Sequence, residues 1–186
     1  MKKVWGEDNV QDISKVMADA KSKKKEIQFG WLFGISVEKN SELLKDNKAR
    51  KFKGRVVFQG NRVVNQNWDV AVFQDMGNSP ATMDASRAAD CYGCFPGHGV
   101  QIADAEQAYI QADLKGNDCW ITLPPDRVPP HWKKKYPHIT RPVVRLVKAL
   151  YGHPDSGSFW EEHCDKRVKI AGFTPMGAEW PSCYYH

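Results

Sequence analysis

The sequence of 186 residues contains no long hydrophobic run. Its longest stretch without Asp, Glu, Lys or Arg covers residues 91–103, which is 13 residues including His98, Pro96 and three glycines. A membrane-spanning helix needs roughly 20 apolar residues, so the sequence excludes a transmembrane helix. No apolar run follows Lys2 and Lys3 at the start of the chain, so we expect no secretory signal and an intracellular location.

Cysteine is scarce, with five residues and a single Cys-x-x-Cys motif formed by Cys91 and Cys94. A structural zinc site needs four ligands, and because no second Cys-x-x-Cys is present, zinc is the less favoured interpretation. The odd number of cysteines, without a secretory signal, favours reduced thiols. We interpret the pair as ordinary cysteines packed under a turn at the end of a helix.

Aromatic residues are plentiful, with seven Trp, eight Phe and six Tyr, and their area is sufficient for a real hydrophobic core. Charge is unevenly distributed: residues 1–60 hold 14 Lys/Arg and 8 Asp/Glu, residues 61–126 hold 3 and 9, and residues 127–186 hold 10 and 5. An acidic middle between two basic ends is compatible with a polyanion-binding groove around a metal centre. Charge alone favours a simpler interpretation, three solvated surfaces with local charge bias.

The spacing of apolar residues predicts an α+β fold that mixes hairpins with separated helices. Strands are predicted at residues 31–37, 55–59, 100–103, 119–123, 142–147 and 182–186. Helices are predicted at residues 8–21, 80–93, 105–112 and 158–171, the last with a capping box of Ser158 and Glu161. We expect the first two strands to form a long hairpin with basic side chains around its tip, and residues 127–142 to form a loop.

Four segments match one protein family in order and spacing. They are Lys53-Gly54-Arg55-Val56-Val57-Phe58-Gln59-Gly60; Asn78-Ser79-Pro80 with Arg87 downstream; Asp104-Ala105-Glu106-Gln107-Ala108-Tyr109-Ile110-Gln111-Ala112-Asp113-Leu114 followed by Leu123-Pro124-Pro125; and Val144-Arg145-Leu146-Val147-Lys148-Ala149-Leu150-Tyr151-Gly152 with Trp160 and Gly172-Phe173. Through these segments, about residues 30–186 resemble the reverse transcriptase domain of copia-type retrotransposons, an RNA-directed DNA polymerase.

The resemblance implies the fingers hairpin and part of the palm of a right-hand polymerase. It divides the chain into a lysine-rich N-terminal arm (1–30), fingers (about 31–80) and part of the palm (about 81–186). It also implies an RNA or DNA template–primer and deoxynucleoside triphosphates as partners, and Mg²⁺ as cofactor. Such polymerases use two metal ions, which stabilise the attacking and the leaving oxygen and take carboxylate ligands.

Asp104 matches the family's first catalytic carboxylate, which is also a metal ligand at a strand-to-helix junction. From the residues alone, Asp104 followed by Gln107 is also typical of a helix N-cap. Tyr109 matches the aromatic residue that acts as the steric gate against a ribose 2′-hydroxyl, and the alternative is an ordinary core aromatic. We expect Asp104 at the end of the strand at 100–103, at the base of an open cleft into which Tyr109 points.

Two further motifs match nucleotide-binding positions of the family. Lys53 and Arg55 match the fingers cations that hold the incoming triphosphate, and Arg suits bidentate phosphate contact. The alternative is a solvated hairpin edge. Tyr151 and Gly152 match the turn beneath the nascent base pair, where glycine lets backbone approach closely.

Three parts of the family are missing from the sequence. The family's Tyr-x-Asp-Asp loop, which supplies the other two carboxylates, is expected beyond His186, and no such string occurs. The thumb and RNase H regions are also missing. One carboxylate cannot hold two Mg²⁺ ions, so we expect little or no polymerase activity from this chain alone. Two alternatives stay open: a non-enzymatic nucleic-acid-binding remnant of such an element, and a structural fragment without a selected function.

Overall fold

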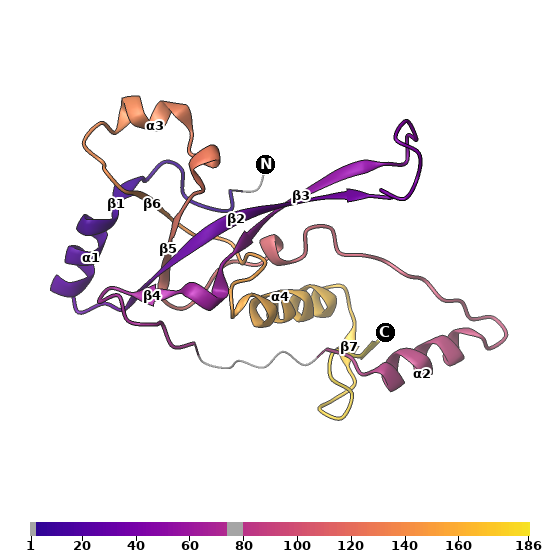
Figure 1. Cartoon of the computed structure of the whole chain (residues 1–186). Helices are drawn as coiled ribbons and strands as arrows, with labels where there is room; N and C mark the ends of the chain where they lie inside the picture. Colours follow the sequence, from indigo (N-terminus) through magenta and orange to yellow (C-terminus); the bar gives the residue numbers. More distant parts are fainter. Residues whose placement is uncertain (1–2, 74–79) are drawn as a thin grey trace.

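A computed structural model describes residues 3–73 and 80–186, which form an α+β fold (Figure 1). The described residues contain four α-helices, α1 (Ile13–Ser22), α2 (Met83–Gly93), α3 (Pro130–Lys135) and α4 (Ser156–Ile170), and short 3₁₀ turns η1 (Gly60–Arg62), η2 (Tyr109–Gln111) and η3 (Pro125–Arg127). Within the described ranges, no helix combines the length and the apolar character needed to cross a membrane.

A mixed sheet of six strands forms the centre of the fold. The strands are β1 (Gln11–Asp12), β2 (Ile27–Lys39), β3 (Lys51–Phe58), β4 (Val64–Asn65), β5 (Asp118–Thr122) and β6 (Pro142–Arg145). Their order is β1-β6-β5-β2-β3, and β4 pairs with β2 as well. β2 runs parallel to β5, whereas the other pairs are antiparallel. The predicted strands at 31–37, 55–59, 119–123 and 142–147 are therefore confirmed.

The two longest strands, β2 and β3, form the predicted hairpin, which projects from the body of the molecule (Figure 1). At its base Phe29, Leu32 and Phe58 are buried in the core. Towards the tip, residues 33–37 of β2 and 51–55 of β3 are exposed. The hairpin is therefore anchored at one end by apolar burial, while both faces of its outer half remain accessible.

Helix α1 packs on one face of the sheet. Its buried residues Ile13, Val16, Met17 and Ala20 join Ile27, Phe29, Trp120 and Val143 in one cluster. Asp12 caps the helix by accepting from the Ser14 amide at 2.9 Å, and it also accepts from the Arg141 amide. These backbone hydrogen bonds, the one from Arg141 first, lower the pKa of Asp12. The predicted helix thus begins at residue 13 rather than 8, and the boundary predicted at residue 30 falls inside β2.

Helix α4 lies below the sheet in Figure 1 and begins at Ser156, two residues before the predicted start. The predicted capping box is not at the N-cap, because Asp155 holds that position and Ser158 lies inside the helix. The hydroxyl of Ser156 donates to the Leu150 carbonyl at 2.7 Å and accepts from the Leu150 amide at 3.0 Å. These two bonds tie the start of α4 to the turn that carries Tyr151. At the C-terminus, β8 (Tyr184–Tyr185) pairs with β7 (Thr174–Pro175).

The segment between residues 80 and 117 departs most from prediction. Helix α2 forms where expected, with the Thr82 hydroxyl accepting from the Ala85 amide at 3.1 Å. The predicted strand at 100–103 is wrong: these residues are coil, and Ile102 is 93% exposed. The predicted helix at 105–112 is also wrong, since only the short η2 forms and Gln107 has a positive φ of 52°. Val100 and Ile102 are exposed, so a strand there would lack the burial that stabilises it. Tyr109 and Ala112 do pack with Phe159 of α4, but from a single short turn and not from a helix.

The segment at residues 127–142 also differs from its prediction. The loop predicted at 127–142 contains α3, which begins with a proline at its first position, a common helix start. The three lysines in its last turn interact favourably with the negative end of the helix dipole. Asn78 and Ser79 of the second family motif lie outside the described residues.

Candidate nucleic-acid interface

One face of the hairpin carries the predicted cations. In the register of β2 and β3, Ile35 lies opposite Arg55, Val37 opposite Lys53, and Lys39 opposite Lys51. Opposite residues in an antiparallel pair project to the same face, so this face combines four cations with an apolar strip. Lys53 and Arg55 were expected here from the family resemblance, whereas Lys39 joins them through the register, which the sequence does not reveal.

This face is concave at its centre. A hollow of about 430 Å³ is lined by Ile35, Val37, Lys39, Lys53, Arg55, Val57, Tyr151 and Gly152, with no carboxylate among them. We call these eight residues the hairpin site. Four of the five predicted nucleotide-binding residues lie in it, so the fold brings together positions almost 100 residues apart in sequence. Uncompensated cations beside apolar and aromatic surface suit a polyanion that also carries rings.

The turn at Tyr151 is clamped to the base of the hairpin. The Phe58 amide donates to the Tyr151 carbonyl at 2.7 Å. Gly152 has φ +89°, and a Cβ on it would collide with the Phe58 carbonyl oxygen. A Cβ on Gly60 would in turn collide with the Gly152 carbonyl. Both glycines are required because two backbone segments approach each other directly here.

Three predicted site residues form a contact chain beside this turn. The Arg55 guanidinium lies 6.0 Å from the centre of the Tyr151 ring. The Tyr109 ring meets the Tyr151 ring edge to face, with centres 4.4 Å apart. Tyr109 itself lies in η2 and packs against a small cluster of Ala112, Ala149 and Phe159. Tyr109 therefore packs against buried residues, as a core aromatic would, and also contacts Tyr151 of the hairpin site.

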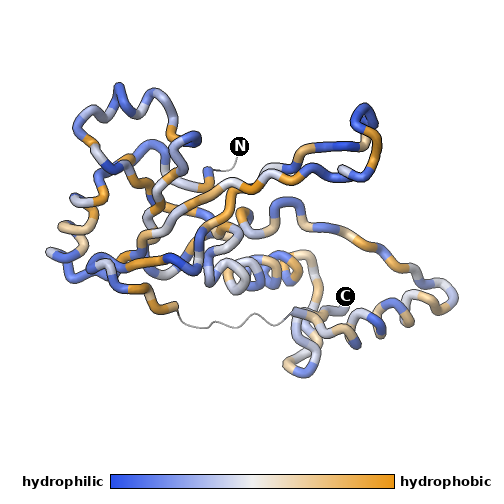
Figure 2. Tube along the Cα trace, in the orientation of Figure 1, coloured by the Kyte–Doolittle hydropathy of each residue, from blue (hydrophilic) through white to orange (hydrophobic). Residues whose placement is uncertain are grey.

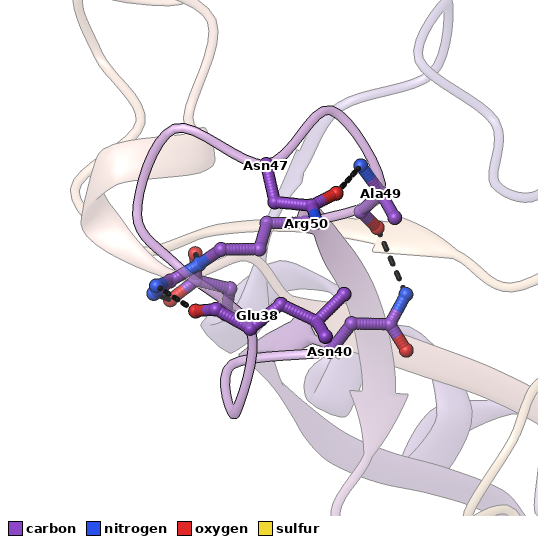
Figure 3. A network of polar contacts seen from close by, with 6 residues as sticks. Glu38, Asn40, Asn47, Ala49 and Arg50 are labelled. Carbon is purple, nitrogen blue, oxygen red and sulfur yellow. Dashed lines mark hydrogen bonds and ion pairs between the residues drawn. The ribbon is translucent and has the colours of Figure 1, made fainter.

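The hairpin tip is held by its own polar network (Figure 3). Arg50 donates through two nitrogens to the two carboxylate oxygens of Glu38, each at 2.8 Å. Asn40 donates to the Ala49 carbonyl and Asn47 accepts from the Ala49 amide, both at 2.9 Å. The hydrogen bonds from Arg50 lower the pKa of Glu38. In this pair Arg50 and Glu38 neutralise each other's charge.

A buried histidine lies directly behind the turn. His153 is 5% exposed, and its ring is 4.9 Å from the Phe58 ring and 5.5 Å from the Phe73 ring, centre to centre. Burial lowers the pKa of His153 to about 4. Its Nδ1 accepts from the Asp155 amide at 3.3 Å, whereas Nε2 has no partner within the described part of the chain. This neutral ring packs behind the turn against Phe58 and Phe73, a role that no sequence motif indicated.

Asp104 stands apart from these residues. It is exposed in the coil between α2 and η2, not at the end of a strand, so the predicted strand-to-helix junction is not formed. It makes no hydrogen bond or ion pair within residues 3–73 and 80–186. By contrast, Asp113, which follows η2, forms an ion pair with Lys148 at 2.5 Å. That hydrogen bond lowers the pKa of Asp113.

The described residues do not fit a metal centre. Across the two described ranges, no three His, Cys, Asp or Glu side chains come together in a way that would hold a metal ion. Cys91 and Cys94 are exposed free thiols at the end of α2, not packed under a turn as predicted. Asp104 alone provides one carboxylate, while Mg²⁺ in a two-metal site requires several oxygen ligands.

Comparisons with protein-family models, with curated proteins and with solved structures gave no match.

Proposed function

We propose that this chain is the fingers and part of the palm of a copia-type reverse transcriptase, and that the hairpin site binds the phosphates of a deoxynucleoside triphosphate and of a template–primer. The observation that supports this most is the meeting of Arg55, Tyr151 and Tyr109. These three family-matched positions come from three separate segments, yet they lie in one contact chain.

In this proposal the cations and the aromatic rings have different tasks. Lys39, Lys53 and Arg55 neutralise phosphate oxygens, with Arg55 held in place over the Tyr151 ring. Gly152 exposes backbone where a base pair would lie, and Tyr109 would limit the space beside the sugar. Asp104 would supply one carboxylate for Mg²⁺ by resemblance, but among the described residues it belongs to no group of three or more side chains that could hold a metal ion.

A second candidate function is nucleic-acid binding without catalysis. The observation that favours it is the position of Asp104 in an exposed coil, together with a hairpin site that contains no carboxylate. Both candidates use the same cations and the same phosphate contacts. They differ only in whether phosphoryl transfer can take place.

Binding is tested with a fluorescent primer–template duplex and the double variant Lys53→Ala/Arg55→Ala. Charge-assisted phosphate contacts predict an affinity at least about tenfold weaker, and a slope of log affinity against log salt shallower by about 2. The control variant Lys15→Ala/Lys21→Ala removes the same charge from the exposed surface of α1 and should change the affinity much less. Equal losses in both variants would reject a specific hairpin site.

Catalysis is tested by primer extension with Mg²⁺ or Mn²⁺. We expect no extension by residues 1–186, with duplex binding retained. Extension that Asp104→Asn abolishes would favour the polymerase over the non-enzymatic candidate and would show that the catalytic centre is complete in this chain.

A further inference from the structure

A second hollow, of about 520 Å³, shares no lining residue with the hairpin site. It is enclosed by the segment around α3, the start of α1, and the part of β2 that precedes the hairpin's outer half. The lining residues that matter here are Trp31, Trp68, Trp132, Lys133, Tyr136 and Arg141. Its volume is in the usual range for small-molecule sites. We call it the tryptophan pocket.

Trp68 forms an exposed aromatic wall of this pocket. It is 47% exposed and stacks on buried Phe29, with ring centres 6.3 Å apart and an angle of 22° between the planes. Its φ is +69°, an uncommon value for a large side chain. The Trp68 amide donates to the Asn65 carbonyl at 3.1 Å, and this turn fixes its position. A large ring is thus held on a rigid support with much of its surface accessible.

Trp132 contributes a buried donor without an acceptor. The residue is 3% exposed, and its indole Nε1 has no hydrogen-bond partner within the described residues. Buried polar groups are nearly always hydrogen-bonded, so such a donor calls for an explanation. Because Trp132 lines the pocket, an acceptor atom on a bound ligand would provide one.

The charge of the pocket is of one sign. Lys133 and Arg141 are exposed at its wall, and no Asp or Glu lines it. Within residues 3–73 and 80–186, the Lys133 ammonium and the Arg141 guanidinium form no ion pair; the guanidinium donates to the Ser14 hydroxyl at 3.2 Å, while the Arg141 backbone amide donates to the Asp12 carboxylate at 3.1 Å. Nearby, the Arg62 guanidinium covers the Trp31 ring at 5.1 Å. A ligand here would therefore meet stacking surfaces, one buried donor and positive charge.

We propose that the tryptophan pocket binds a planar aromatic ring that carries an acceptor atom and an anionic group, the chemistry of a nucleotide. The ring stacks on Trp68, the acceptor receives the Trp132 indole N–H, and the anion lies at Lys133 and Arg141. The source is either a free nucleotide or an unpaired nucleotide of a single strand. This inference is independent of the hairpin site, since it uses none of its residues.

The test follows the indole N–H resonances of the ¹⁵N-labelled chain during titration with deoxyadenosine monophosphate. The Trp132 signal is assigned by its loss in Trp132→Phe. We expect this signal to shift and to saturate, whereas deoxyadenosine and inorganic phosphate alone should bind at least about tenfold more weakly. A short oligodeoxyadenylate that binds much more tightly than the mononucleotide identifies a single strand as the source, and equal affinity identifies the free nucleotide.

Matched variants separate this site from the hairpin site. Trp68→Ala removes a half-exposed ring and should weaken mononucleotide binding about tenfold or more, while the remaining indole signals show that the fold persists. Arg141→Gln should weaken it less. Lys53→Ala/Arg55→Ala should leave it unchanged, even if the hairpin site proves wrong. A Trp132 signal that does not move at saturating mononucleotide, or an affinity indifferent to Trp68→Ala, would overturn the assignment.

Discussion

The strands of the hairpin site and the coil that carries Asp104 both show alternating apolar residues in sequence, but only the hairpin segments form strands. The strands of the hairpin pair with each other, and their base is buried by Phe58 and by the turn at Gly152. The coil at residues 98–105 also has alternating apolar residues, yet Val100 and Ile102 are exposed. Figure 2 shows this hydrophobic stretch in the coil after α2, away from the sheet. A strand pattern becomes a strand only where another strand and a covering layer are present.

The same difference applies to the residues each region positions. Arg55 and Tyr151 are held by a backbone clamp and a ring contact, so their geometry follows from the core. The Asp104 side chain makes no hydrogen bond or ion pair with the described part of the chain and is exposed. The comparison predicts that substitutions at the clamp affect the whole fold, whereas equivalent changes in the coil have local effects.

The largest effect is expected from Gly152→Ala. The substitution forces a Cβ into the Phe58 carbonyl at φ +89°, so the free energy of unfolding should fall by more than about 3 kcal/mol. Gly97 has a similar φ of +81° but open space around it, so Gly97→Ala should cost about 1–2 kcal/mol at most. Denaturant unfolding of both variants measures the difference. Equal losses would mean that backbone conformation, not the close approach, determines the effect.

The next effect concerns pH. The pKa of His153 is about 4 in the folded chain because of burial, against an ordinary value of 6.5. The unfolded chain therefore takes up the proton first as the pH falls, and stability present above pH 6.5 should be lost between pH 6.5 and 4, by up to about 3 kcal/mol.

Unfolding free energies measured across this pH range test the prediction. His153→Gln should flatten the profile in that window. A wild-type profile that is flat from pH 6.5 to 4 would contradict burial of a neutral ring behind the turn.

A smaller effect is expected for the ring contact between Tyr109 and Tyr151. A double-mutant cycle with Tyr109→Leu and Tyr151→Leu should give a coupling free energy of about 0.5–1.5 kcal/mol, the usual value for an edge-to-face pair. Tyr92 and Phe95 make a similar contact, with ring centres 6.0 Å apart, at the exposed end of α2. Their cycle should give a coupling near zero in global unfolding. Comparable couplings would show that the end of α2 unfolds together with the core.

The smallest effect is expected for Ile102→Ser. The side chain is 93% exposed, so the free energy of unfolding should change by no more than about 0.5 kcal/mol. Ile121, fully buried in β5, provides the comparison: Ile121→Ala should cost about 2–5 kcal/mol. A large loss on Ile102→Ser would mean that the coil packs against a surface in solution.

Part of the fold could be predicted from the sequence. Long, strongly patterned segments such as β2, β3 and α4 were predictable because local propensity and burial agree there. Short elements were not predictable in this way. The segment that forms α3 was predicted as a loop because it is rich in proline and lysine, although Pro130 stands at a common helix start. The strand predicted before Asp104 was wrong for the opposite reason: the alternation is present, but no neighbouring strand pairs with it in the described residues.

The candidate site was only partly accessible to sequence reasoning. Lys53, Arg55 and the Tyr151 turn were named through family resemblance, and their meeting depends on contacts between distant segments. Lys39 required the register of the hairpin, and the part played by His153 required burial by Phe58 and Phe73. Such long-range features follow from the assembled fold and leave no fixed spacing in the sequence.

The most direct test maps where a polyphosphate binds. Inorganic tripolyphosphate has no ring, so it should occupy the hairpin site and not the tryptophan pocket. In a titration of the ¹⁵N-labelled chain without metal, we expect the largest amide shifts at Lys39, Lys53, Arg55 and Gly152, and their loss in Lys53→Ala/Arg55→Ala. Shifts concentrated in residues 98–105 or on α1, with the hairpin site silent, would contradict the assignment of phosphate binding to this face.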